Sequence, residues 1–292
     1  MKIESLSFLV GSEKIDQTKR FGKDFVKKTG IPFTFRNIKN PIEFITDAFK
    51  NIQGYHDADA LIHVTQSQVN ALPNDASLIQ NLCGINSNIL SITVNQGCSG
   101  FVQAVLLANS LLESYSYKKI IIVTNDWYTH FINYDDRATS ALFSDGVALT
   151  IISNDKGYKI KKHVNYTDGS GWKHLYKKNN DDKAHIYMDG LAVYDFTKKI
   201  VINKIIKENI NLESITKDTK FYIHQASNFV LNEIYKLLPK ECCFSNLEKY
   251  GNTVSSTIPI LINEFPLEAQ RIFMIGFGVG LSASLIEMEK EK

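Results

Sequence analysis

The sequence predicts an α/β fold, in which strands and helices alternate along a chain of 292 residues. Two patterns predict this fold. Short runs of β-branched and aliphatic residues recur along the chain, and they are nearly all apolar, as strands are when both faces of their sheet are covered. Between them lie longer segments whose apolar residues repeat with helical spacing. Strands separated by helices indicate an α/β architecture rather than a β-sandwich or a helical bundle.

The expected elements follow one another in an alternating order. Six apolar runs are expected to be strands, at residues 60–64, 89–94, 120–124, 148–152, 221–224 and 272–276. Five amphipathic patterns are expected to be helices, over residues 42–51, 75–82, 100–114, 193–208 and 228–238. The helix over 100–114 is the longest before the middle of the chain, and its apolar side includes Phe101, Val105 and Leu112.

No proline-rich or glycine/serine-rich linker divides the chain. The pattern is weakest over residues 155–189, where polar residues cluster at 177–182, so we expect a long excursion with an exposed turn between two halves. Each half holds a strand that leads to a reactive side chain and then to a helix, at Cys98 in the first half and at His224 in the second. This parallel indicates an internal duplication, with halves over residues 1–155 and 156–292.

Composition argues against several classes of protein. The chain has 33 basic and 31 acidic residues, so no strong electric field favours nucleic acid or an anionic membrane as a partner. No secretory signal is visible, and no run approaches the roughly 20 apolar residues of a membrane-spanning helix. Four cysteines without C-x-x-C spacing predict neither a disulfide framework nor a zinc site. We expect a cytoplasmic protein with reduced thiols and no metal.

Cys98 is the first candidate for chemistry. It follows an apolar strand and precedes the helix over 100–114, so it meets a helix N-terminus, where unpaired amides and the helix dipole favour a thiolate. Gly97 and Gly100 would let the backbone turn sharply and let a substrate approach. Cysteine is also a common buried residue. The local pattern therefore leaves a nucleophile and a packing role equally open.

Three further segments in the second half of the chain could take part in chemistry. His224 follows an apolar strand, at the end where α/β proteins usually place their functional groups, and could act as acid, base or hydrogen-bond donor. A histidine bonded in a strand-to-helix turn is an equal alternative. Asn252 lies in a Gly-Asn sequence that reads as an ordinary turn. The glycines at 276–280 lack a dinucleotide-binding context, and their amides could face an oxyanion or simply form a tight turn.

The order of these segments resembles that of the β-ketoacyl-acyl carrier protein synthase III family, in the thiolase superfamily, over nearly the whole chain. Residues 97–101 resemble the family's Cys-Ser-Gly-Phe nucleophile motif, residues 224–226 its His-Gln-Ala-Asn block, and residues 251–253 its Gly-Asn-Thr block. Shorter matches lie at residues 28–31, 142–146, 188–190 and 277–280. Any one of these matches is weak, but together, in the correct order and spacing, they are strong.

The resemblance implies a thiolase fold, with two similar halves stacked in five layers (αβαβα), usually as a homodimer. The half over 1–155 would carry the nucleophile, and the half over 156–292 the histidine and asparagine. Cys98 would attack an acyl thioester of coenzyme A or of an acyl carrier protein and become the S-acyl intermediate, with the backbone amides of Cys98 and Val279 as its oxyanion hole. His224 and Asn252 would bind the thioester oxygen of a malonyl-type donor and stabilise the enolate that forms as carbon dioxide leaves. No resident cofactor is implied.

The resemblance also implies residues that bind the substrate. Leu142, Met188 and Phe196 are candidates for the acyl pocket. Lys28 keeps a positive charge for the phosphates of coenzyme A, and Arg137 lies where the family often has an arginine that contacts phosphate.

Three positions depart from the family's pattern. Ser227, at the fourth place of the histidine block, replaces the asparagine and is a further candidate for substrate binding. Phe229 stands where the family usually has an arginine associated with carrier-protein docking, and Asp24 replaces a cofactor-stacking tryptophan. These changes imply retained chemistry with altered recognition of the acyl carrier. They favour an enzyme of a specialised pathway over the initiator of general fatty-acid synthesis.

Two other functions remain open. The same acyl-Cys98 intermediate could pass its acyl group to an alcohol or amine without decarboxylation, or the chain could be a non-catalytic subunit that dimerises with an active partner. An acyltransferase needs a base but has less need of an asparagine, so the presence of both His224 and Asn252 favours condensation. The intact Cys-His-Asn set argues against a non-catalytic subunit.

Overall fold

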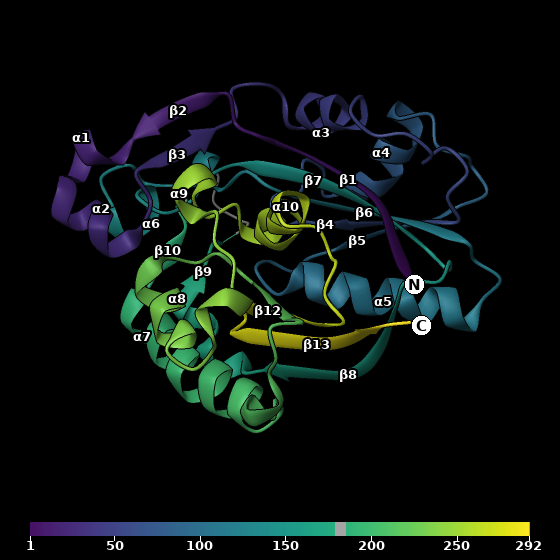
Figure 1. Ribbon diagram of the computed structural model, residues 1–292. Coiled ribbons are helices and arrows are strands. Elements are labelled where there is room, and N and C mark those ends of the chain that lie inside the picture. Colours follow the sequence, from purple (N-terminus) through teal and green to yellow (C-terminus); the bar gives the residue numbers. More distant parts are fainter. Residues whose placement is uncertain (179–184, 292) are drawn as a thin grey trace.

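The computed structural model describes residues 1–178 and 185–291, and its strands form two large mixed sheets and two small ones (Figure 1). The first large sheet has the order β1 (Lys2–Val10), β7 (Gly146–Ser153), β6 (Lys119–Asp126), β4 (Ala60–Val64), β5 (Leu90–Val94). The second has the order β8 (Tyr158–Thr167), β13 (Ser282–Lys290), β12 (Arg271–Gly278), β11 (Thr219–Ile223). The chain completes the first sheet before it begins the second. No helix in the described ranges is long and apolar enough to cross a membrane.

The two large sheets repeat one arrangement. In each, the first strand of the half pairs antiparallel with the last, the last pairs antiparallel with the strand before it, and that strand pairs parallel with β4 or β11. β5 takes the next position in the first sheet, and a single parallel bridge between Phe221 and Cys243 lies there in the second. The two large sheets therefore share one order and direction of strands.

The repeat corrects one detail of the sequence interpretation. The strand before His224 is β11, which is the counterpart of β4 and not of β5, the strand that leads to Cys98. Cys98 lies between β5, the strand next to β4, and the central helix α5. Asn252 lies between the bridge at Cys243, next to β11, and the central helix α10, so by position in the fold it is the counterpart of Cys98. In the second half only the isolated bridge at Cys243 takes the place of β5, so no strand pattern precedes Asn252 in the sequence.

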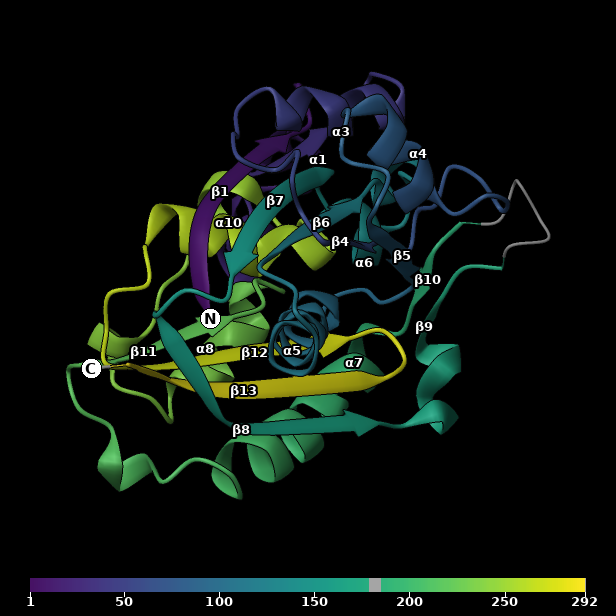
Figure 2. The same cartoon turned by 90° about the vertical axis from the view of Figure 1, so that its right-hand side faces the viewer.

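Helices fill the space between the two large sheets and cover their outer faces. α5 (Gly100–Ser114) and α10 (Thr257–Glu264) lie between the sheets and contact strands of both, as Figures 1 and 2 show. The first sheet is covered on its outer face by α3 (Pro41–Phe49) and α4 (Asp75–Leu82). The second is covered by α7 (Gly190–Phe196), the π-helix η3 (Thr197–Lys207) and α8 (Asn228–Tyr235). The result is the expected five-layer αβαβα fold.

Side-chain alternation along the strands builds three apolar layers. On β4, Ile62 packs in the central core with the residues of α5, whereas its neighbour Leu61 packs in the outer core with α3 and α4. On β12, Met274 belongs to the central core and Phe273 to the outer core of the second half. Both faces of these central strands are therefore buried, which explains why the strands read as continuous apolar runs.

The expectation of an irregular excursion over residues 155–189 is partly wrong, because this region contains β8, an edge strand paired with β13. Along β8 buried or half-buried positions alternate with exposed ones such as Lys159 and Lys161, so no continuous apolar run marks it. β9 (Leu175–Tyr176) and β10 (Tyr187–Met188) then form a small two-stranded sheet. The predicted turn at 177–182 lies largely outside the described residues.

The remaining elements are short. β2 (Glu13–Asp16) and β3 (Phe33–Arg36) form a hairpin that holds α1 (Gln17–Phe21) and α2 (Lys23–Thr29), and α2 contacts α8 of the second half. The other short helices are η1 (Tyr128–His130), α6 (Arg137–Ser140), η2 (Gly169–His174), η4 (Leu212–Ser214), η5 (Lys240–Cys242), α9 (Leu247–Tyr250) and η6 (Val254–Ser256). The contact between α2 and α8 brings the first half of the chain over the site described next.

Candidate active site

Cys98 lies just before the N-terminus of α5, in the middle of the molecule, where the two halves meet. Two glycines of β12 let the second half approach it closely. A Cβ at Gly276 would lie 2.8 Å from the carbonyl oxygen of Cys98, and a Cβ at Gly278 would lie 2.9 Å from its sulfur. The next residue, Ser99, hydrogen-bonds through its hydroxyl to that of Ser282 at 2.8 Å. The position of Cys98 therefore depends on both halves of the chain.

Gly278→Ala is expected to slow acylation of Cys98 by roughly 10²-fold, because displacement of a reacting atom by about 1 Å has effects of that size. The new methyl group would collide with the Cys98 sulfur, and Gly278 has a φ of 155°, which residues with a side chain rarely adopt. Acylation is measured by intact-protein mass after mixing with acyl-CoA. Gly169→Ala is the matched control, since no atom lies within 4 Å of its Cβ position. Equal rates in the two variants would show that the contact with the sulfur is unimportant.

The Cys98 side chain is buried, and both its burial and two backbone amides affect the pKa of its thiol. Burial raises the pKa of Cys98 to about 12, and the nearby Asp126 adds to this rise. The backbone amides of Val279 and of Cys98 itself act in the opposite direction and lower its pKa. The resting side chain is thus a neutral thiol. These are the two amides that the resemblance assigns to an oxyanion hole.

His224 follows the last residue of β11 and is buried. Its Nδ1 atom lies 2.7 Å from the hydroxyl oxygen of Thr257, and its ring meets the ring of Phe277 edge-on at 5.6 Å. Burial lowers the pKa of His224 to about 3, so the imidazole is neutral at physiological pH.

Asn252 lies in a loop held in an unusual conformation. Its side-chain oxygen accepts a hydrogen bond from the backbone amide of Val254 at 2.9 Å, and its side-chain nitrogen lies 3.4 Å from the carbonyl oxygen of Ala226. Val254 has a φ of 54°, which is rare for a β-branched residue. The hydroxyl of Ser255 donates to Asp126 at 2.6 Å and ties this loop to the first half. The backbone strain is therefore compensated by contacts that orient the Asn252 carboxamide.

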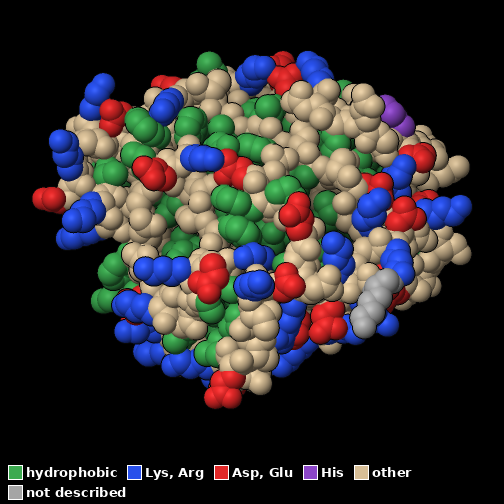
Figure 3. All heavy atoms as spheres, in the orientation of Figure 1, with side chains coloured by type: hydrophobic (Ala, Val, Ile, Leu, Met, Phe, Trp, Pro, Cys, Tyr) green, Lys and Arg blue, Asp and Glu red, His purple; other side chains and the backbone are tan. Residues whose placement is uncertain are grey.

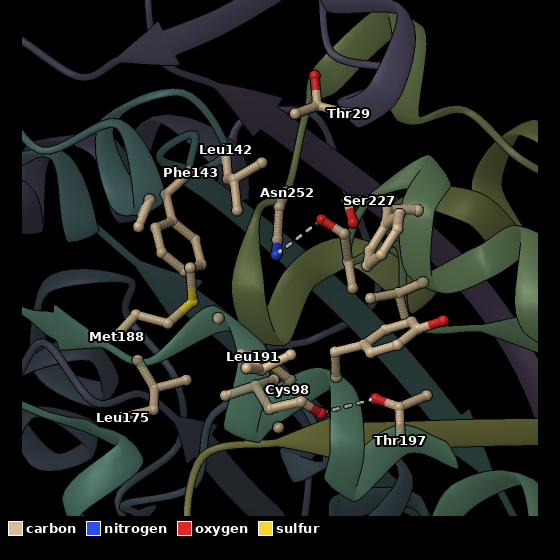
Figure 4. Close-up of a pocket in the computed structure, with 18 of the residues that line it drawn as sticks. Thr29, Cys98, Leu142, Phe143, Leu175, Met188, Leu191, Thr197, Ser227 and Asn252 are labelled. Carbon is tan, nitrogen blue, oxygen red and sulfur yellow. Dashed lines mark hydrogen bonds between the residues drawn. The ribbon is translucent and has the colours of Figure 1, made fainter. Parts of the chain in front are cut away.

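Cys98, His224 and Asn252 line one cavity of about 470 Å³, which Figure 4 shows with ten of its residues labelled. The predicted substrate-binding residues Lys28, Arg137, Leu142, Met188 and Ser227 also line it. The structure thus brings together the three predicted catalytic residues and five of the six predicted binding residues. In the described parts of the chain, no three His, Cys, Asp or Glu side chains are grouped as metal ligands.

Phe196 does not line this cavity, contrary to the expectation for the acyl pocket. It is buried in the outer core of the second half, 6.3 Å from the ring of Tyr166 on β8. Val193 and Tyr194, earlier on α7, line the cavity instead. The Val279 side chain borders a second cavity and packs against the apolar cluster that contains Cys98.

The mouth of the cavity combines residues that the sequence analysis named with two aromatic residues, Phe25 and Tyr194, that it did not. Phe25 lines it, next to Asp24, and the guanidinium carbon of Arg137 lies 4.9 Å from the centre of the Phe25 ring. The ring of Phe229, which is 56% exposed, contacts that of Tyr194 in a tilted arrangement, with ring centres 4.5 Å apart. Basic side chains gather over α1 and α2 (Figure 3). The mouth is thus aromatic and basic, a combination suited to an anionic ligand with an apolar part.

Comparison with known proteins identifies the family. Family models described as 3-oxoacyl-[acyl-carrier-protein] synthase III and its C-terminal region match residues 92–169 and 207–288. A β-ketoacyl-[acyl-carrier-protein] synthase III of Acholeplasma laidlawii is 32% identical over 72% of this chain and 69% of its own. The chain belongs to the β-ketoacyl-acyl carrier protein synthase III family. It is an acyltransferase of the condensing type.

Two other synthase III relatives extend the likeness over nearly the whole chain. A β-ketoacyl-[acyl-carrier-protein] synthase III of Clostridium perfringens is 29% identical over 96% of this chain and 95% of its own. The crystal structure of a 3-oxoacyl-(acyl-carrier protein) synthase from Burkholderia xenovorans superposes with a TM-score of 0.87 at 26% identity, over 99% of this chain and 93% of the other. The thiolase fold inferred from the sequence motifs is confirmed.

Proposed function

We propose that this synthase III relative forms an acyl-enzyme on Cys98 and condenses the acyl group with a malonyl thioester. The observation that carries the proposal is the single cavity that holds Cys98, His224 and Asn252, with the Cys98 sulfur lying directly against Gly278 at the end of β12. In the first step the Cys98 sulfur attacks the thioester carbonyl, the amides of Cys98 and Val279 bind the oxyanion, and the leaving thiolate takes the thiol proton.

In the second step the malonyl carboxylate leaves as carbon dioxide and its electron pair passes to an enolate. Donors on His224 and Asn252 stabilise the enolate oxygen. The enolate carbon then attacks the acyl carbonyl, a carbon–carbon bond forms, and the bond to Cys98 breaks. The Cys98 thiolate takes up a proton, and a β-ketoacyl thioester leaves.

The lining of the cavity supports specific roles for the binding residues. Leu142 and Met188, which lie close to Phe143 and Leu175 in Figure 4, offer an apolar surface for the acyl chain. Lys28 and Arg137, at the mouth, supply positive charge for the phosphates of coenzyme A or of a carrier-bound phosphopantetheine.

The mouth also supports a specialised pathway. Ser227 and Phe229, which replace the family's asparagine and arginine, both line the cavity, and the Phe229 ring covers Tyr194 there. A basic docking residue is thereby replaced by an apolar one. We infer that the delivery of acyl groups differs from that of general fatty-acid synthesis.

The protein is proposed to act as a homodimer joined through β5. No other strand of residues 1–178 and 185–291 pairs with the outer edge of β5, and its residues Leu90, Ile92 and Val94 are at least partly exposed. No charge or proline interrupts this edge, so it is a template for pairing with another strand. Antiparallel or parallel pairing with β5 of a second copy would bury both edges.

Leu90→Asp is expected to convert dimer to monomer in size-exclusion chromatography with light scattering, because a buried charge without a partner opposes association. The matched control is Ile38→Asp, which places the same charge at an exposed apolar residue away from β5. Circular dichroism establishes that both variants remain folded. A wild-type monomer, or a folded dimeric Leu90→Asp variant, would overturn the proposed interface.

The proposed function is tested by intact-protein mass with a panel of acyl-CoAs, followed by a malonyl-CoA chase. An adduct on Cys98 that disappears with release of carbon dioxide and a β-keto product is the expected result. An adduct that persists with malonyl-CoA and with a malonyl carrier protein, but disappears with an alcohol or amine, would replace condensation with simple acyl transfer. No adduct from either acyl-CoA or acyl carrier protein would contradict the catalytic role altogether.

A further inference from the structure

The hydrogen bond between His224 and Thr257 determines what His224 offers to the cavity. A neutral imidazole carries one proton, on Nδ1 or on Nε2, and the bond that one nitrogen makes decides where the proton sits. Nδ1 is bonded to the Thr257 hydroxyl at 2.7 Å. No group of the described chain hydrogen-bonds Nε2, and the residue lines the cavity. Nε2 is therefore the nitrogen available to a substrate, as a donor or as a base.

The Thr257 hydroxyl has one proton and two neighbours that could accept it. One is Nδ1 of His224 at 2.7 Å, and the other is the carbonyl oxygen of Val254 at 3.2 Å. The Val254 oxygen already accepts a bond from the backbone amide of Thr257, which closes the turn at the start of α10. Nδ1 has only the Thr257 hydroxyl as a partner in the described structure. The 2.7 Å contact is shorter than the 3.2 Å contact, and the Val254 oxygen already has its amide partner, so donation from the hydroxyl to Nδ1 is favoured.

We propose that Thr257 is a positioning residue that holds His224 as the tautomer with its proton on Nε2, so that the histidine presents a hydrogen-bond donor to the cavity. Because burial keeps the imidazole neutral, the same ring cannot also carry a proton-accepting nitrogen on that side. Thr257 is fixed in turn by its place at the first turn of α10, and the edge-on contact with Phe277 fixes the ring plane.

This tautomer selects the class of second substrate, an inference that rests on the proposed condensation. A donor at Nε2, together with the side-chain amide of Asn252, suits the carbonyl oxygen of a malonyl thioester and the enolate that develops from it. An alcohol or amine acceptor instead requires a base at Nε2 to remove its proton. The geometry therefore favours a carbon nucleophile generated by decarboxylation over a hydroxyl or amine nucleophile.

The direct test is ¹⁵N NMR of wild-type protein labelled at histidine, with the His224 signals assigned by their absence in His224→Ala. The expected spectrum shows an unprotonated Nδ1 and a protonated Nε2, unchanged from pH 6 to pH 8. A protonated Nδ1 in the wild type would overturn the proposal. This readout is independent of the reaction, so it stands even if no condensation is found.

The kinetic test compares Thr257→Val, Thr257→Ser and Thr150→Val. Thr257→Val removes the donor at constant size and is expected to lower the condensation rate about tenfold or more, while acylation of Cys98 stays within about twofold. Thr257→Ser restores the hydroxyl and should recover most of the rate. Thr150 is buried on β7 and its hydroxyl has no partner in the described structure, so Thr150→Val controls for loss of a buried hydroxyl. A condensation rate in Thr257→Val equal to that of Thr150→Val would sink the assignment.

Discussion

Cys98→Ala is expected to abolish the acyl adduct and to lower the rate of β-keto product formation by about 10⁴-fold or more, the scale seen when a catalytic nucleophile is removed. The physical reason is the geometry around the sulfur. The Cys98 sulfur lies against Gly278, and Cys98 is the only cysteine among the described residues that line the cavity. The measurement is intact-protein mass with acyl-CoA, followed by product analysis after addition of malonyl-CoA.

The matched control is Cys83→Ala. Cys83 is also buried, and burial raises its pKa to about 12, as it does for Cys98. Cys83 lies at the end of α4, in the outer core of the first half, with no contact to the cavity. Its loss should leave both steps unchanged. Since the two thiols share burial and a raised pKa, a difference between the variants would arise from the amides and the cavity rather than from intrinsic acidity. An adduct that survives in Cys98→Ala and maps to another residue would contradict the assigned nucleophile.

Sequence patterns predict those helices and strands that are specified by their own residues. β4, α4 and α5 have the predicted bounds, because a dry strand is a continuous apolar run and a helix repeats its apolar side. β8 lacks that signal, since one side of this edge strand is exposed. The alternation in residues 158–167 is a weaker signal of the same strand and could have identified it.

Some site residues can likewise be recognised from their neighbours in sequence, whereas others depend on contacts between distant parts of the chain. Cys98 stands out because strand, glycine and helix surround it in sequence. Asn252 does not, since its role depends on a left-handed Val254 and on contacts with Asp126 from the other half. The places of Phe25 and Phe196 depend on how α2 and α7 are rotated against the second half, which no spacing within a short helix specifies. Family resemblance supplied Asn252, but it also led to the incorrect expectation for Phe196.

The exchange of His224 for alanine is expected to separate the two steps of the reaction. Acylation of Cys98 should continue, because the change leaves in place the amides of Cys98 and Val279, which we propose to bind the oxyanion of that step. Condensation should fall by about 10²- to 10³-fold, the usual effect of removing one donor to a developing oxyanion. Mass spectrometry should therefore show acyl-enzyme that accumulates in the presence of malonyl-CoA.

A histidine outside the cavity provides the control for this separation. His163 lies exposed on β8, and His163→Ala should leave both steps at the wild-type rate. If His224→Ala also left both rates unchanged, the proposed role in enolate stabilisation would be wrong. If it stopped acylation as well, His224 would be acting as a base toward the Cys98 thiol. That outcome conflicts with a protonated Nε2, because a donor nitrogen has no lone pair with which to accept the thiol proton. The kinetics of His224→Ala thus test the proton on Nε2 that we infer from the hydrogen bond between His224 and Thr257.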